Sequence, residues 1–152
     1  PLAISTAVAG LAELFLEDHL LEEALAQAQT AVDMALSVRK QQNGREAKRV
    51  TAVAWRVLGT VLAIEPTKER QTVIQQQPVQ ASDCFHHSYQ LLAEMGSATA
   101  DELLLTLNHW AKYERLRDET NRAELLLKEA AQIAQRYNLS ALAALSGEQK
   151  VI

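Results

Sequence analysis

His86 and His87, with Cys84 two residues before the first of them, are the side chains that most readily suggest metal chemistry. Imidazole nitrogen and thiolate sulfur are ligands that zinc prefers. On a helix, however, adjacent side chains point about 100° apart, so His86 and His87 cannot easily close on one ion. Cys84 and His87 share a helix face, but two ligands do not make a closed zinc site. We therefore expect no metal site and no cofactor.

The other candidates for chemistry are two further histidines and two tryptophans. We expect His19 to be a solvated turn residue, and His109 to lie either toward a groove or on the general surface. Trp55 and Trp110 could stack on bases, but in apolar helix stripes such residues more often pack the core. The sequence contains no nucleophile elbow, phosphate-binding glycine loop or paired-cysteine motif. The protein is accordingly not expected to be an enzyme.

Composition favours an all-α protein. The 152 residues are 48% hydrophobic and include only five glycines and three prolines, too few breakers for a many-stranded sheet. The net charge of −4 argues against a nucleic-acid surface, which is normally basic. No apolar run reaches about 18 residues, so no membrane span is expected. A single cysteine fits a reducing, cytoplasmic location.

The stretch 52–65 is the best candidate for the centre of the fold. Trp55, Leu58 and Leu62 fall on one helical stripe, since steps of three and four residues return to the same face. Gly59, in the middle of this helix, costs about 1 kcal/mol relative to alanine. We expect it where a neighbouring helix must approach closely. Further on, a second helix carries a small residue and a large one, Ala81 and Phe85, four positions apart.

Helical periodicity also predicts the elements on either side. Helices are expected at about 2–17, 20–41, 45–64, 78–95, 100–116 and 120–137, and a short capping helix at about 141–146. Pro66–Pro78 is polar and is predicted to be a mobile insertion, with Pro78 in the first turn of the next helix. Thr99 and Glu102 have the spacing of a capping box.

The pattern Trp55-x-x-Leu58-Gly59-x-x-Leu62, followed by Ala81-x-x-x-Phe85, resembles the tetratricopeptide repeat family, with Leu62 in place of the usual tyrosine. The resemblance implies an α-solenoid of three antiparallel helix pairs, repeats at about 4–42, 45–96 and 100–138, and a cap at 140–147. The single domain would span 1–152. Since the chain begins Pro-Leu-Ala without methionine, we expect it to be a piece of a longer protein.

A narrower resemblance concerns the third repeat. Leu107–Glu114, Arg117-Asp118 and Ala130-x-x-Ile133-Ala134 are similar to the C-terminal repeats of large bacterial signalling ATPases. Such proteins carry nucleotide cyclase, kinase or helix-turn-helix domains elsewhere in the chain. The resemblance implies a sensor or regulatory module that binds protein.

In such a stack the first helix of each pair would line a concave groove. The predicted partner-binding residues on this face are Arg56, Thr60, Asn108, Lys112 and Arg115. The partner would be a protein, a peptide or another domain of the parent chain. Ala9, Glu13 and Val57 replace the Lys and Asn side chains with which some repeats hold chaperone tails, so that function is not expected. Two alternatives stay open, a self-associating scaffold such as a homodimer and a ligand-sensing pocket that uses Cys84, His86, His87 or His109.

Overall fold

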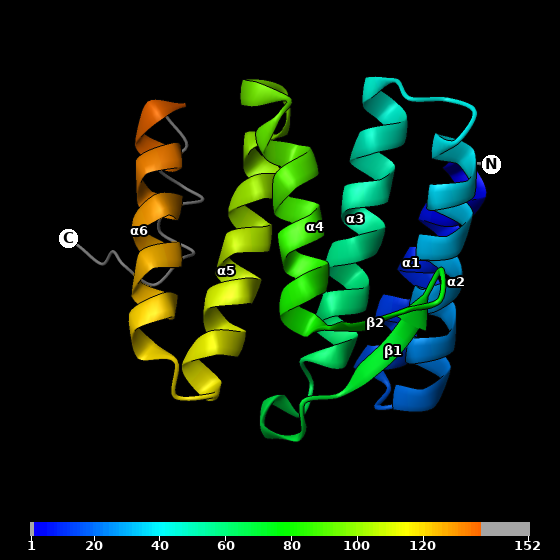
Figure 1. Ribbon diagram of the computed structural model, residues 1–152, viewed down its shortest axis with the longest axis horizontal. Helices are drawn as coiled ribbons and strands as arrows, with labels where there is room; N and C mark the ends of the chain where they lie inside the picture. Colours follow the sequence, from blue (N-terminus) through cyan, green and yellow to red (C-terminus); the bar gives the residue numbers. More distant parts are fainter. Residues whose placement is uncertain (1, 138–152) are drawn as a thin grey trace.

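The computed structural model describes residues 2–137, so the expected cap at 140–147 lies outside the described residues (Figure 1). The elements are α1 (Leu2–Glu17), α2 (Leu21–Arg39), α3 (Arg45–Leu62), the 3-10 turn η1 (Pro66–Lys68), β1 (Gln71–Ile74), β2 (Gln77–Gln80), α4 (Ala81–Ala93), the 3-10 turn η2 (Gly96–Thr99), α5 (Ala100–Leu116) and α6 (Thr120–Arg136). Each α-helix packs against the next along the chain. The predicted all-α helical-repeat fold is confirmed, with the addition of a two-stranded sheet.

The first and third helix pairs turn in the same way. His19, with a φ of 60°, lies in the middle of the α1–α2 turn, and Asp118, with a φ of 63°, lies in the middle of the α5–α6 turn. In each turn the next residue donates its N–H to a carbonyl five residues earlier, at 2.8 Å. Such a bond satisfies carbonyls that the end of a helix leaves free. The two pairs therefore repeat in backbone geometry as well as in sequence pattern.

Small residues sit where the helices of a pair meet. Those that the sequence pattern places in the second helix of each pair are all buried, namely Ala24, Ala31, Ala81, Ser88, Ala123 and Ala130. In the central pair, a Cβ atom added to Gly59 would lie 3.0 Å from Cε1 of Phe85 and 3.2 Å from Cβ of Cys84. This confirms the close approach of α3 and α4 at Gly59, where a Cβ atom would fit only if Phe85 and Cys84 moved by a few tenths of an ångström.

The segment between α3 and α4 differs from the prediction. The sequence predicts a mobile polar insertion at 66–78, but β1 and β2 form an antiparallel hairpin in which Ile74 and Val79 are buried. The side-chain amide of Gln29, on α2, donates to the carbonyl of Val73 at 2.9 Å. β1 contacts α2 and β2 contacts α4, so the hairpin ties the first pair to the second.

Two expected helix starts are also corrected. Pro78 is a strand residue paired with Val73, and α4 begins only at Ala81, after a capping box in which the N–H of Gln80 donates to Asp83 at 2.8 Å. A proline suits an edge strand because it has no N–H to leave unpaired. Thr99 does not form a capping box. Its hydroxyl donates to the carbonyl of Leu92 at 2.9 Å, which closes the link between α4 and α5.

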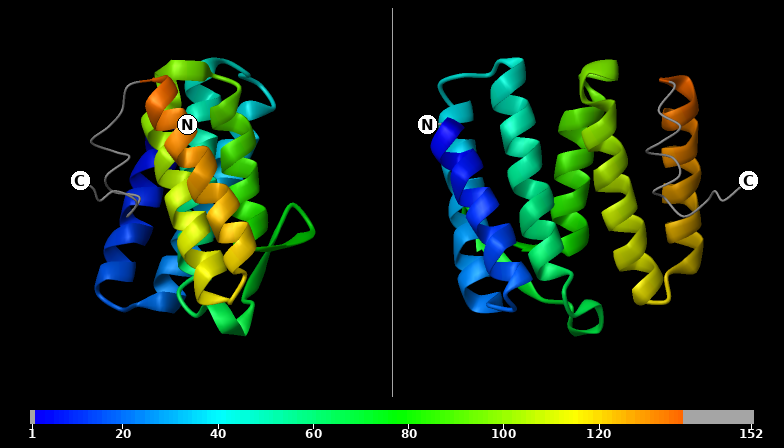
Figure 2. Two further views of the ribbon diagram at one scale, coloured as in Figure 1. Left: turned by 90° about the vertical axis from the view of Figure 1, so that its left-hand side faces the viewer. Right: turned by 180° about the vertical axis from the view of Figure 1, so that it is seen from behind.

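The stack has two different faces. Figure 1 is viewed from the side of α2 and α4, with the hairpin crossing in front of α2, and the right-hand view of Figure 2 is from the side of α1, α3 and α5. α3 contacts both α1 and α5, whereas the hairpin lies between α2 and α4. Among residues 2–137, no helix combines the length and apolar character that crossing a bilayer requires.

Candidate functional site

The predicted partner-binding residues all lie on α3 and α5. Arg56 and Thr60 are one turn apart on α3, where the Thr60 hydroxyl donates to the carbonyl of Arg56 at 2.9 Å. Asn108, Lys112 and Arg115 follow one another along α5. Thr60 and Lys112 line one cavity, and the charges of Arg56 and Lys112 both act on His109, so residues of the two helices meet on one face of the stack.

Two adjoining cavities open on this face. The smaller has a volume of about 260 Å³ and is lined by Thr60, Ala63, Ile64, Phe85, His109, Lys112, Tyr113 and Leu116. The larger, of about 510 Å³, is lined by Leu105, Asn108, His109, Ala111, Lys112, Arg115, Leu116 and Leu127. Because His109, Lys112 and Leu116 belong to both linings, we treat the two cavities as one site and call it the α3–α5 groove.

The groove is a cationic site in a net-acidic chain. Arg56, Lys112 and Arg115 form no ion pair with any described residue. Burial lowers the pKa of the His109 imidazole, and the charges of Arg56 and Lys112 lower it further. The side chain of His109 is therefore neutral at pH 7, and it lies in the positive field of two cations from different helices.

Two polar atoms beside the groove lack hydrogen-bond partners among the described residues. They are Nε of Arg56, which is a donor, and Oδ1 of Asn108, which is an acceptor, and both are enclosed. A buried polar atom without a partner costs about 1–3 kcal/mol.

The smaller cavity adds an apolar part to the groove. Phe85 and Tyr113 are buried in its wall, with ring centres 6.3 Å apart, while Ile64 and Leu116 are about half exposed, at 47% and 54%. The groove thus offers cations next to exposed apolar side chains. This combination suits a ligand that carries a carboxylate beside a large apolar group.

The five predicted residues are not equivalent in the structure. Lys112 lines both cavities, Thr60 only the smaller, and Asn108 and Arg115 only the larger. Arg56 lines neither, although its charge acts on His109. For His109 the sequence allowed either a position toward the groove or one on the general surface. In the structure His109 lines both cavities. The sequence did not identify Ile64 and Leu116 as groove residues. Their only signal in the sequence is that each is an apolar residue at or just after the end of a helix, α3 for Ile64 and α5 for Leu116.

The residues considered for metal chemistry are placed elsewhere. Cys84 is buried in the core, and burial raises the pKa of its thiol. The His87 ring stacks on the Trp55 indole, with ring centres 4.5 Å apart. Among the described residues, no group of three or more His, Cys, Asp or Glu side chains is placed to hold a metal ion.

Neither tryptophan presents an open stacking platform. Trp55 is 5% exposed and belongs to the core, as predicted. Trp110 is half-buried, and its indole N–H donates to the carboxylate of Glu114 at 3.1 Å. Glu114 is fully buried, and Arg117 and Arg122 lie 3.4 and 3.6 Å from it. Trp110 thus helps to satisfy a buried charge at the α5–α6 turn.

Comparison with known proteins adds no further guide to function. No protein-family model, curated protein or solved structure matches this chain.

Proposed function

We propose that this chain is a non-catalytic protein-interaction module, and that its α3–α5 groove binds an acidic segment of a partner protein or of another domain of the parent chain. The resemblance to repeats of bacterial signalling proteins supports a sensor or regulatory role. A packed helical stack presents a preformed surface, which lowers the cost of ordering on binding.

The observation that carries the proposal is a set of three cations in or beside the groove that form no ion pair with any residue in 2–137. Arg56 on α3 and Lys112 on α5 both act on His109, and Arg115 lines the same groove one turn beyond Lys112. The cluster is cationic although the chain as a whole has a net charge of −4, so it is a local reversal of the overall charge. A carboxylate placed here would satisfy the cations, and an adjacent leucine-like side chain would cover Ile64 and Leu116.

The test begins with selection from a random peptide display library on the full chain. We expect enrichment of Asp or Glu next to large apolar residues. A selected peptide is then titrated against wild type and Lys112→Glu/Arg115→Glu by fluorescence anisotropy. Loss of two cations and gain of two anions should weaken binding at least about tenfold. Melting should change little, because both residues are exposed and exposed charges contribute little to folding.

A matched control separates local from general electrostatics. Lys40→Glu/Lys128→Glu makes the same change in net charge at two exposed lysines that line neither cavity of the groove. Binding by this control should stay within about twofold of wild type. Equal loss in both variants, no loss in either, or no acidic enrichment would each overturn the proposal.

Self-association is a second candidate, and one observation favours it. Ile4, Leu11 and Leu14 are exposed on α1, at spacings of seven and three residues that place them on one stripe. A stripe of this kind can pair with a second helix. Measurement of solution mass for wild type and Leu11→Glu tests this. A monomer at all accessible concentrations would remove the candidate.

A further inference from the structure

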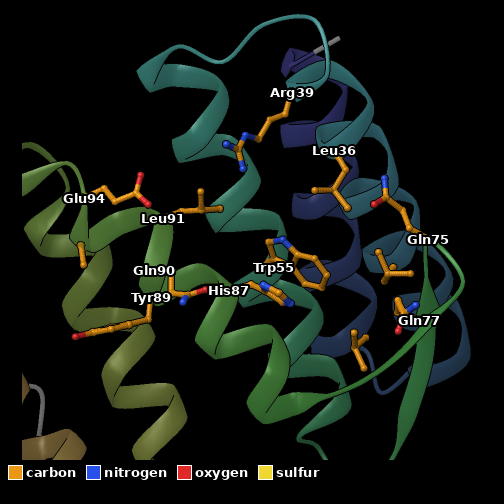
Figure 3. Close-up of a pocket in the computed structure, with 13 residues that line it drawn as sticks. Leu36, Arg39, Trp55, Gln75, Gln77, His87, Tyr89, Gln90, Leu91 and Glu94 are labelled. Atoms are coloured by element: carbon orange, nitrogen blue, oxygen red, sulfur yellow. The ribbon is translucent and has the colours of Figure 1, made fainter.

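A separate cavity, of about 760 Å³, lies on the other side of α3. α2, α3, α4 and the hairpin all contribute to its wall, and Figure 3 shows most of these side chains. The full lining is Leu36, Arg39, Trp55, Ile74, Gln75, Gln77, Val79, His87, Tyr89, Gln90, Leu91, Ala93 and Glu94. None of these residues lines the α3–α5 groove, so binding in this cavity is independent of the proposed function.

The hairpin forms one side of this cavity. Its buried residues, Ile74 and Val79, belong to the lining, and so do Gln75 and Gln77 beside its tip. Gln75 and Gln76 make the two-residue turn with φ of 51° and 69°. Glycine or asparagine is usual in such turns, since other residues are strained there. The turn therefore keeps a long amide side chain at the mouth of the cavity despite a backbone cost.

Two oppositely charged residues, Arg39 and Glu94, line one end of the cavity. Arg39 extends from the end of α2 and Glu94 from the end of α4, and Figure 3 shows them directed toward one another with Leu91 between them. They do not form an ion pair with each other. Arg39 donates from Nη2 to Asn43 at 2.8 Å, and its Nε is enclosed without a partner among the described residues. It thus has no carboxylate partner in residues 2–137.

Glu94 has a different environment from Arg39. Nζ of Lys48 lies 3.4 Å from its carboxylate, which is largely exposed and keeps most of its acceptor capacity. A ligand with one negative and one positive group would find an oppositely charged residue for each group at this end of the cavity. It would gain two charge-assisted hydrogen bonds, which are about twice as strong as neutral ones.

Next to this charged end, aromatic and aliphatic side chains form part of the cavity wall. The Trp55 indole and the His87 ring are stacked at 27° to one another, and Leu36 and Leu91 flank them (Figure 3). Burial lowers the pKa of His87, with a smaller contribution from His86, so its ring is neutral at pH 7. A flat or branched apolar group can pack against this surface without desolvating a charge.

We propose that this cavity binds a free α-amino acid with a large apolar or aromatic side chain. Its carboxylate contacts Arg39, its ammonium group contacts Glu94, and its side chain packs against His87, Leu91 and the small part of Trp55 that is exposed. The amides of Gln75, Gln77 and Gln90 lie around the opening and supply hydrogen bonds to the remaining polar atoms. The volume lies within the usual range of about 300–1,000 Å³ for ligand sites.

The test uses the full chain and three matched probes: L-phenylalanine, 3-phenylpropanoate, which lacks the ammonium group, and 2-phenylethylamine, which lacks the carboxylate. Titration is followed by calorimetry and by the NMR signal of the Trp55 indole N–H. We expect L-phenylalanine to bind at least about tenfold more tightly than either analogue, and more tightly than L-alanine to the same degree.

Single variants then assign the two charges. Arg39→Gln should abolish the preference for L-phenylalanine over 2-phenylethylamine, and Glu94→Gln should abolish the preference over 3-phenylpropanoate. Lys40→Gln, next to Arg39 but outside the lining, should bind as wild type does. If Arg39→Gln fails to fold, Arg39→Lys keeps the charge and tests the geometry, with weaker binding expected. Absence of L-phenylalanine and L-leucine binding up to about 10 mM, equal binding of the analogues, or unchanged preferences in both charge variants would overturn the proposal.

Discussion

At the scale of single residues, His109 reports on the charge of the groove. Its pKa is lowered first by burial and then by Arg56 and Lys112. Lys112→Gln should therefore raise the His109 pKa, and Lys40→Gln should leave it unchanged. Two-dimensional NMR titration of the imidazole signals measures both. Equal His109 pKa values in wild type and Lys112→Gln would show that Lys112 is not oriented toward the groove in solution.

The same lowered pKa has a consequence for stability. The unfolded chain takes up a proton on His109 near its ordinary value of about 6.5, whereas the folded chain resists that proton to lower pH. The stability that the neutral His109 side chain contributes is thus fully present above about pH 6.5. It is lost as the pH falls toward the lower pKa that His109 has in the folded chain. The acid-induced loss of unfolding free energy between pH 7 and 5 should be smaller in His109→Gln than in wild type.

At the scale of elements, the contact between α3 and α4 decides the effect of replacing glycine. Gly59→Ala should destabilise the protein by about 1–3 kcal/mol, because the new Cβ meets Phe85 and Cys84, and this outweighs a gain of about 1 kcal/mol in helix propensity. Gly10→Ala is the control. Its Cβ meets nothing within 4 Å, so it should stabilise by about 0.5–1 kcal/mol. Urea unfolding measures both, and stabilisation by both would contradict the close approach.

The hairpin shows why an element can escape prediction. Each strand has only four residues, and half of the residues of β1 and β2 are polar, with Ile74 and Val79 as their buried side chains. An isolated two-stranded hairpin is marginally stable in water. It gains its stability from α2 and α4, through the buried pair and the bond from Gln29 to Val73. The fold must first bring these helices together, so the stability of the hairpin depends on residues outside it. The segment itself therefore shows little of the alternating pattern by which a strand is predicted.

At the scale of the molecule, the helix pairs share their cores. One buried cluster joins α1, α2, α3, the hairpin and α4 with Tyr113 of α5, and a second joins α4, α5 and α6 with Ala52 of α3. Leu91 and Trp110 pack against both clusters, so neither can be lost without exposing part of the other. We therefore expect cooperative unfolding of the described helices.

Trp55→Ala tests this cooperativity. Removal of a buried tryptophan should cost about 3–5 kcal/mol of unfolding free energy and lower a single transition seen by circular dichroism. The exposed Val73→Ala serves as a control and should change stability by no more than about 0.5 kcal/mol. A loss below about 1 kcal/mol for Trp55→Ala would mean that Trp55 is not a core residue. Two separate transitions would mean that the pairs fold independently.

The sequence by itself determined the helices, their order and the burial of Trp55. These follow from local periodicity and from small residues at fixed spacing, since each helix satisfies its own backbone and shows its apolar stripe in consecutive residues. It also placed Lys112, Asn108 and Arg115 on one helix face. Only the tertiary structure decided that His109 and Leu116 line two cavities at once, that the hairpin packs against α2 and α4, and that Arg39 and Glu94 line the same cavity. Those arrangements depend on how separate elements pack, and no local pattern in the chain encodes the distance between side chains that are fifty residues apart.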